Sequence, residues 1–248
     1  REHVGNDPHA DAGQKDADVD VAEQQCGGEV DRRGVRLERQ LAQAEPFASA
    51  QALEVGPRFS PDGRQVAYAE GTGPQSTIVV RTLAGGARRT LGDPTDLNLS
   101  PVFFPDGTRI AYFRRGARGE CAIVAQDLAG GPPQTLLDCT RKPRPQFDLA
   151  PDGRQLVYVA VTRPQFPAGL LVRDLATGDD RVLTAPDPDM GDDLHPRVAP
   201  DGERVAFFRG TQSHRQLWLV DLAQPATARA AGVQRGLAYG AAWLGPQG

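Results

Sequence analysis

The sequence lacks the long apolar runs, the basic excess and the ligand clusters that mark several common functional classes. No window approaches the ~18 uninterrupted apolar residues of a membrane-spanning helix, so we expect no membrane span in this chain. The net charge of −4 gives no general reason to expect direct contact with nucleic acid. The four histidines are not spaced like metal ligands, so no metal and no other cofactor is expected.

Signatures of catalysis are also missing. The Gly-x-Ser-x-Gly motif of a hydrolase nucleophile occurs nowhere, and the nearest segment, Gly210–His214, ends in histidine. No glycine-rich loop is suited to cradle a phosphate. We therefore predict no catalytic residues and a protein that binds and is not an enzyme.

Residues 1–34 contain no leucine, no isoleucine and no aromatic residue. Such a segment cannot bury enough apolar surface to offset the entropy that ordering would cost. We expect residues 1–34 to be a disordered leader, and residues 35–248 to form the folded part of the chain.

The folded part contains four copies of a Pro-Asp-Gly motif, whose aspartates are 44, 46 and 49 residues apart. This spacing is typical of the four-stranded blades of a β-propeller. The copies are Pro61, Asp62 and Gly63; Pro105, Asp106 and Gly107; Pro151, Asp152 and Gly153; and Pro200, Asp201 and Gly202.

The residues of the motif favour a tight turn that joins two antiparallel strands. Proline presets the second position of a type I turn, and glycine takes the left-handed conformation that closes a three-residue hairpin loop with a bulge. Short apolar runs rich in β-branched and aromatic residues follow each copy, as in Val66–Tyr68. Four strands repeated four times predict an all-β propeller, because a sandwich would show no such regular period. The expected blades lie near 56–91, 100–137, 146–184 and 195–231, and a partial fifth starts from 241.

The sequence leaves two possibilities for the ring of blades. Val35–Leu41 has the pattern of a stray fourth strand that could complete a final blade. A degraded fifth copy around Trp243 favours further blades beyond Gly248 and an incomplete ring, although closure with four blades is conceivable.

The segment Gly56–Tyr68 and the copies at Pro101–Tyr112 and His195–Phe207 resemble the repeat of TolB-like, WD-repeat-like propellers. The resemblance covers about Val35 to Gly248, and it is specific for the fold and weak for function. It implies one of three settings: an envelope protein like TolB, the periplasmic propeller of a CadC-like winged-helix transcriptional regulator, or the gating propeller of a prolyl-oligopeptidase-type peptidase. The pattern is most similar to the second.

Cys121 and Cys139 lie symmetrically about the Gly130-Gly131 turn of the second blade. In a hairpin this symmetry places them opposite each other, within reach of a disulfide. Two reduced buried thiols are the alternative. A disulfide would favour an oxidising compartment, so we expect a periplasmic protein.

Loops at one end of the propeller carry the predicted binding residues. A basic patch is expected beside an acidic one formed by Asp187, Asp189, Asp192 and Asp193, and such a pair could steer a charged protein or peptide partner. The alternative is a set of ordinary solvated loops. His195 precedes a proline at the entry to a first strand, where it could hydrogen-bond a neighbouring loop or contact a ligand at the channel mouth. The candidate binding residues are Arg114, Arg115, Arg118, Arg141, Lys142, Arg144 and His195.

These observations predict a sensing or interaction module of the bacterial envelope. The rival is the gating propeller of a serine peptidase whose catalytic domain is absent. A sugar-processing lyase built on the same repeat would need metal-binding histidines, which this chain lacks.

Overall fold

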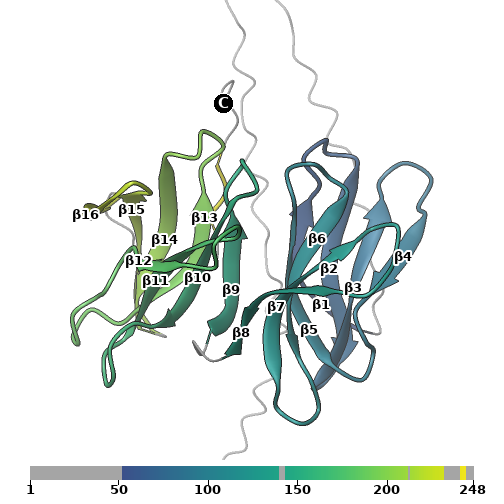
Figure 1. Ribbon diagram of the computed structural model, residues 1–248, viewed down its shortest axis with the longest axis horizontal. Helices are drawn as coiled ribbons and strands as arrows, with labels where there is room; N and C mark the ends of the chain where they lie inside the picture. Colours follow the sequence, from purple (N-terminus) through teal and green to yellow (C-terminus); the bar gives the residue numbers. More distant parts are fainter. Residues whose placement is uncertain (1–51, 140–142, 212, 232–240, 244–248) are drawn as a thin grey trace, which may run out of the picture. The chain divides into compact units, whose positions relative to one another are not determined.

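The computed structural model describes residues 52–139, 143–211, 213–231 and 241–243. These residues form sixteen strands in four sheets, and within each sheet every strand pairs antiparallel with the next one along the chain (Figure 1). The predicted all-β propeller of four-stranded blades is thereby confirmed. No helix in the described ranges is long and apolar enough to cross a membrane.

Each blade contains four consecutive strands. Blade 1 consists of β1 (Leu53–Phe59), β2 (Gln65–Thr72), β3 (Gln75–Thr82) and β4 (Arg88–Leu91). Blade 2 consists of β5 (Leu97–Phe103), β6 (Arg109–Arg115), β7 (Cys121–Asp127) and β8 (Gln134–Asp138). Blade 3 consists of β9 (Pro143–Leu149), β10 (Gln155–Val161), β11 (Ala168–Asp174) and β12 (Asp180–Val182). Blade 4 consists of β13 (Asp192–Val198), β14 (Arg204–Gly210), β15 (Arg215–Asp221) and β16 (Gln224–Ala230).

The second strand of each blade is buried over four or more consecutive residues, as in the run from Leu156 to Ala160 of β10. A strand that alternated between core and solvent would bury only every second residue. Continuous burial arises because a blade packs against neighbours on both faces. This packing explains why the sequence after each turn is uniformly apolar.

Three hydrophobic clusters lie between successive blades. Phe103 of blade 2 joins a cluster with Ile78 and Leu91 of blade 1. Leu149 and Val198, which hold the same place in blades 3 and 4, join the next two clusters, and all three side chains are at most 9% exposed. Phe59, the matching residue of blade 1, is 68% exposed. The described core is therefore made at the junctions between blades.

The Pro-Asp-Gly turns differ in one detail from the predicted loop. In blade 1 the backbone N–H of Ser60 donates to the carbonyl of Gln65, so four residues lie between this pair and not three. The extra residue is Arg64, whose N–H donates to Asp62 Oδ1. Gly63 takes the expected left-handed conformation, with φ of 68°. The same aspartate contact recurs in the other three blades, so the aspartate side chain fixes the loop length.

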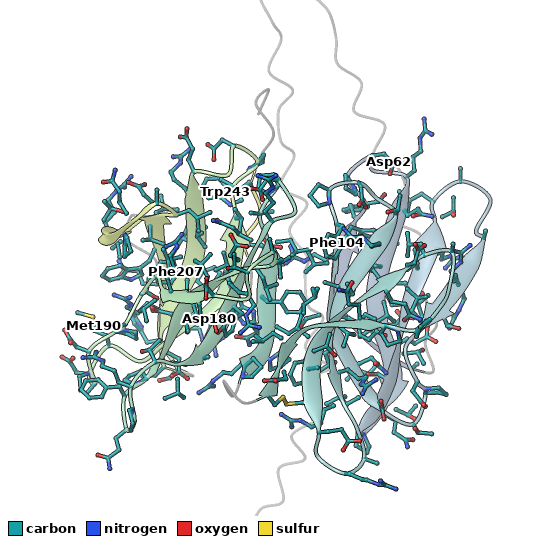
Figure 2. The ribbon with its side chains drawn as sticks, in the orientation of Figure 1. Asp62, Phe104, Asp180, Met190, Phe207 and Trp243 are labelled. Atoms are coloured by element: carbon teal, nitrogen blue, oxygen red, sulfur yellow. A yellow bond between two sulfur atoms is a disulfide. The ribbon has the colours of Figure 1, made fainter. Side chains whose placement is uncertain are left out.

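The ends of the chain's repeats are less regular. In blade 4, Leu222 and Ala223 form the turn between β15 and β16, and Gln224 and Pro225 lie inside β16. Residues 241–243 contain no strand, and Val35–Leu41 lies outside the described residues. Trp243 packs on blade 4, where its indole Nε1 donates to the carbonyl of Arg197 at 2.9 Å (Figure 2).

The first strands β1, β5, β9 and β13 are irregular. Their pairing with the second strands shifts at one point in every blade, which marks a β-bulge. In three blades the residue at this point has a positive φ and precedes a proline: Gly56, Ser100 and His195. His195 therefore lies within β13, at a bulge, and not at the entry to the strand as predicted. A bulge re-aims side chains, here into the space between the first strands.

Candidate functional site: the axial cavity

A cavity of about 480 Å³ lies among the four first strands, and we call it the axial cavity. Its walls come from all four blades, and its apolar part includes Val55, Leu99 and Phe147. Its polar side chains come from the bulged segments of β1, β5, β9 and β13. They are Arg58, Ser100, Gln146, His195 and Arg197.

Some hydrogen-bonding atoms of these side chains have no partner in the part of the chain that the structure describes. Gln146 Oε1 is buried there without a hydrogen bond. Within the described ranges, the guanidinium of Arg197 donates only to the carbonyl of its own neighbour, Pro196. Buried polar groups in native proteins are nearly always hydrogen-bonded, because an unmet group costs about 1–3 kcal/mol. A cavity lined by such groups is suited to a polar ligand.

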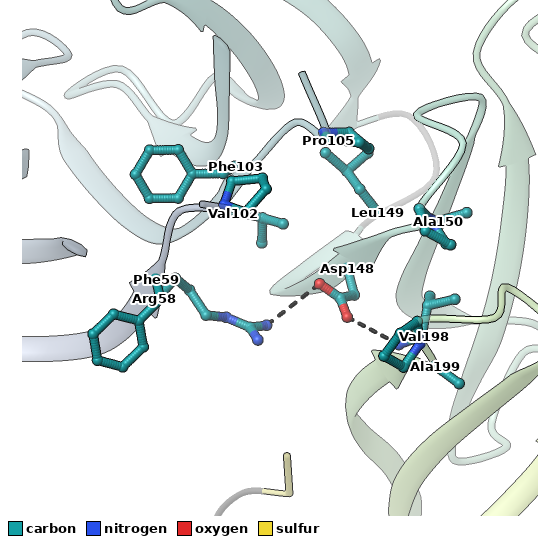
Figure 3. Close-up of a pocket in the computed structure, with 13 residues that line it drawn as sticks. Arg58, Phe59, Val102, Phe103, Pro105, Asp148, Leu149, Ala150, Val198 and Ala199 are labelled. Atoms are coloured by element: carbon teal, nitrogen blue, oxygen red, sulfur yellow. Dashed lines mark hydrogen bonds and ion pairs between the residues drawn. The ribbon is translucent and has the colours of Figure 1, made fainter. Parts of the chain in front are cut away.

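One carboxylate lies beside the axial cavity. Asp148 of β9 forms an ion pair with Arg58 of β1, with Nη2 and Oδ1 3.5 Å apart, and its Oδ2 accepts the N–H of Val198 at 2.9 Å. Figure 3 shows these two contacts from opposite sides of the carboxylate. Asp148 lines a second cavity of about 290 Å³ beside the Pro-Asp-Gly turns, and Arg58 lines both cavities. Asp148 thus links blades 1, 3 and 4.

The electrostatic balance of the region is cationic. Two guanidinium groups, those of Arg58 and Arg197, face the single carboxylate of Asp148. Burial and, to a lesser extent, the charge of Arg58 lower the pKa of Arg197 to about 10, against the opposing effect of Asp148. At neutral pH both arginines are charged, so a bound anion would relieve their mutual repulsion.

His195 contributes a neutral imidazole. Burial lowers its pKa below the ordinary value of 6.5, and the charges of Arg197, Arg215 and Arg58 lower it further. The side chain is therefore uncharged at neutral pH, with one ring nitrogen as donor and the other as acceptor. Of the predicted binding residues that the structure describes, His195 alone lies on the axial cavity.

Sequence reasoning missed the charged residues of the axial cavity, although one signal could have found them. Aligning the repeats on their Pro-Asp-Gly turns places Arg58, Val102, Asp148 and Arg197 at the same position. Three of the four are charged, at a position inside a predicted strand of a blade core. Charges at such a position are expensive unless they are paired or functional.

The predicted basic patch is partly neutralised by neighbouring carboxylates. Arg114 forms an ion pair with Asp96 at 3.6 Å, and Arg144 forms one with Asp192 at 3.1 Å. Arg118 is exposed. The guanidinium of Arg115 lies 5.6 Å from the ring centre of Phe113. Arg141 and Lys142 lie outside the described residues. Binding by this patch stays a prediction.

The predicted acidic patch also has fewer available carboxylates than expected. Asp193 is fully buried and accepts two hydrogen bonds from Arg209, so it is not available to a partner. Asp187 and Asp189 are exposed. The loops at this end therefore present fewer free charges than the sequence indicated.

The predicted disulfide between Cys121 and Cys139 is confirmed, with Cα atoms 5.3 Å apart. Cys121 begins β7, whereas Cys139 follows the end of β8 by one residue. The disulfide links the start of β7 to the residue after β8, in the outer part of blade 2 and away from the axial cavity. No group of three or more His, Cys, Asp or Glu side chains in the described ranges is arranged to hold a metal ion.

The sequence matches the family described as TolB beta propeller domain over residues 37–244. This chain belongs to that TolB propeller family. The match spans all four described blades, and the Pro-Asp-Gly turns lie within it.

Solved structures with the same fold differ widely in activity. TolB from Acinetobacter baumannii matches with a TM-score of 0.63 and 18% identity, over 76% of this chain and 45% of that one. A puromycin-hydrolyzing peptidase of Mycobacterium tuberculosis matches with a TM-score of 0.58 and 21% identity, over 79% and 31% of the two chains. An oligogalacturonate lyase in complex with manganese matches with a TM-score of 0.57 and 12% identity, over 74% and 54%. At these identities the similarity to solved structures shows the fold alone, and this TolB propeller chain spans less than two thirds of the length of each of the three.

Proposed function

We propose that this TolB-type propeller is a non-enzymatic interaction module that holds a protein or peptide partner at the axial cavity. The observation that carries the proposal is one cavity lined by polar side chains of several blades. Among the described residues, Gln146 Oε1 has no hydrogen-bond partner there, and the guanidinium of Arg197 donates only to the carbonyl of Pro196. Cavities at the centre of a propeller present residues from several blades to one ligand. A partner that supplies the missing hydrogen bonds would be favoured there.

The proposed compartment is the periplasm. The Cys121–Cys139 disulfide supports it, because such bonds persist in oxidising environments. Membership of the TolB propeller family supports an envelope setting, either as a TolB-like protein or as the sensory propeller of a membrane-anchored transcriptional regulator.

The test is photo-crosslinking from inside the axial cavity. A photoreactive amino acid replaces Gln146, and the full chain is expressed in its native envelope. The matched control carries the same amino acid at Arg89, which is exposed on β4, the outermost strand of blade 1. We expect a discrete crosslinked species from position 146 that position 89 does not give. Equal crosslinking from both positions, or none from position 146, would contradict the proposal.

The second candidate is the gating propeller of a serine peptidase. The similarity to the puromycin-hydrolyzing peptidase, of which this chain covers 31%, favours it. Reading the coding sequence on both sides separates the two. A downstream α/β-hydrolase with Gly-x-Ser-x-Gly supports the peptidase, and an upstream winged helix with one membrane span supports the regulator.

A further inference from the structure

The charges around the axial cavity indicate which kind of polar ligand it would bind. The charged side chains that line it are Arg58 of β1 and Arg197 of β13, whereas β5 contributes only the neutral Leu99 and Ser100. Asp148 of β9 lines the neighbouring cavity of about 290 Å³, where it contacts Arg58. The axial cavity therefore has two positive charges on its wall, and the carboxylate that offsets them lies beside it.

Asp148 cannot satisfy both arginines. Its Oδ1 is 3.5 Å from Arg58, and its Oδ2 is used by the N–H of Val198. Arg197 forms no ion pair with any described residue, and only one of its guanidinium nitrogens has a hydrogen-bond partner among them. Elsewhere in the molecule partly buried arginines are matched, as Arg173 is by Asp180 and Arg209 by Asp193. The unmatched guanidinium of Arg197 is therefore a property of this cavity and not of the whole protein.

The fork of donors on a guanidinium fits the two oxygens of a carboxylate. The neutral His195 and the amide of Gln146 can add hydrogen bonds without adding charge. Phe147 and Leu99 supply an apolar wall beside the arginines. A carboxylate attached to a short apolar or peptide group matches this combination better than a fully solvated inorganic ion, which would leave the apolar wall uncovered.

We propose that the axial cavity is a carboxylate-binding site, in which Arg197, with Arg58 beside it, binds an acidic side chain or the C-terminal carboxylate of a peptide. The proposal rests on the proposed interaction function and names the chemistry of the partner. Arg197 makes the main contact, because its Nε and Nη2 donors have no partner among the described residues. Arg58 contributes charge while it stays paired with Asp148.

The test uses small probes and arginine resonances. The full chain is labelled with ¹⁵N-arginine, and the Nε–H signals are followed by NMR at pH 7. Acetyl-glutamyl-methylamide probes an acidic side chain, and acetyl-phenylalanine probes a C-terminal carboxylate. Acetyl-glutaminyl-methylamide and acetyl-phenylalaninamide are the matched neutral probes. We expect saturable shifts of the Arg197 and Arg58 signals with at least one carboxylate probe and none with its neutral partner.

Substitutions test whether the carboxylate probe binds in the axial cavity. Arg197→Gln should weaken binding of the carboxylate probe by about tenfold or more, because a charge-assisted hydrogen bond is lost. Arg197→Lys should bind with intermediate affinity, since the charge remains and the fork is lost. Arg89→Gln removes the same charge from an exposed site on the outer strand β4 and should change the affinity less than twofold. Asp148→Asn removes the competing carboxylate and should tighten binding.

Two results would overturn the proposal: equal shifts with the charged and neutral probes, or equal weakening by Arg197→Gln and Arg89→Gln. Unchanged arginine signals far from the cavity check that each variant is folded. Crosslinking from position 146 without carboxylate binding would refute the carboxylate chemistry and leave the interaction function standing. Absence of that crosslinking would instead refute the proposed function.

Discussion

The buried pair of Asp193 and Arg209 gives the sharpest stability prediction. Asp193 is fully buried, and its two oxygens accept hydrogen bonds from Arg209 Nε at 2.6 Å and Nη2 at 2.9 Å. Thr184 Oγ1 also donates to Asp193 at 2.5 Å, which ties the end of blade 3 to blade 4. The guanidinium lies 4.3 Å from the ring centre of Trp218. The pair is thus desolvated and fully matched.

Asp193→Asn keeps the shape of the side chain and removes its charge. Arg209 is then left buried without a counter-charge, which typically costs about 3–5 kcal/mol. For a domain of this size each 1 kcal/mol lowers Tm by roughly 2–4 °C, so Tm should fall by roughly 6–20 °C. Asp189→Asn, at an exposed carboxylate, is the matched control and should cost less than about 0.5 kcal/mol.

Urea unfolding followed by tryptophan fluorescence measures both effects, with the disulfide kept intact. A double-mutant cycle adds Arg209→Met, which replaces the remaining charge with an apolar side chain. The double variant should be less destabilised than the sum of the single variants by at least about 2 kcal/mol. A cost below about 1 kcal/mol for Asp193→Asn, or additive effects in the cycle, would show that the pair is not desolvated as described.

Three further predictions concern the repeat and its disulfide. Cys139→Ser opens a loop of 18 residues and should lower the free energy of unfolding by about 3 kcal/mol, as measured with urea; reductant should then no longer change the stability of the variant. The backbone N–H of Thr108 holds the pKa of Asp106 below its usual value, so its contribution to stability is present above pH ~4 and lost as the pH falls through the folded pKa; a carboxyl pKa at or above the usual value in an NMR titration would contradict this. Gly153→Ala places a Cβ on a residue with φ of 69° and should cost about 1–2 kcal/mol in urea unfolding, whereas a neutral effect would mean that the turn adjusts.

The blades could be predicted because their signals are local. Each Pro-Asp-Gly turn acts within a few residues, and the apolar run after it reflects burial on both faces of a blade. The loop length was missed by one residue because it depends on a side-chain contact, that of Asp62 with the N–H of Arg64. The disulfide was predictable from the symmetry of Cys121 and Cys139 about a single turn.

The residues of the axial cavity could not be predicted from local sequence signals. Arg58, Asp148 and Arg197 lie in three different blades, and only the arrangement of the blades brings them together. The loop charges were misjudged for a related reason. The carboxylates that pair with Arg114 and Arg144 lie on neighbouring junctions, at Asp96 and Asp192, so counting charges within one loop overstated the exposed basic surface.

Crosslinking from the axial cavity in a variant background tests the central claim most directly. The photoreactive amino acid at position 146 is combined with Arg197→Gln in one sample and with Arg89→Gln in another, and the crosslinked species is quantified in the native envelope. We predict a several-fold loss of that species with Arg197→Gln and no loss with Arg89→Gln. Equal yields in the two samples would contradict a partner held by the arginines of this cavity.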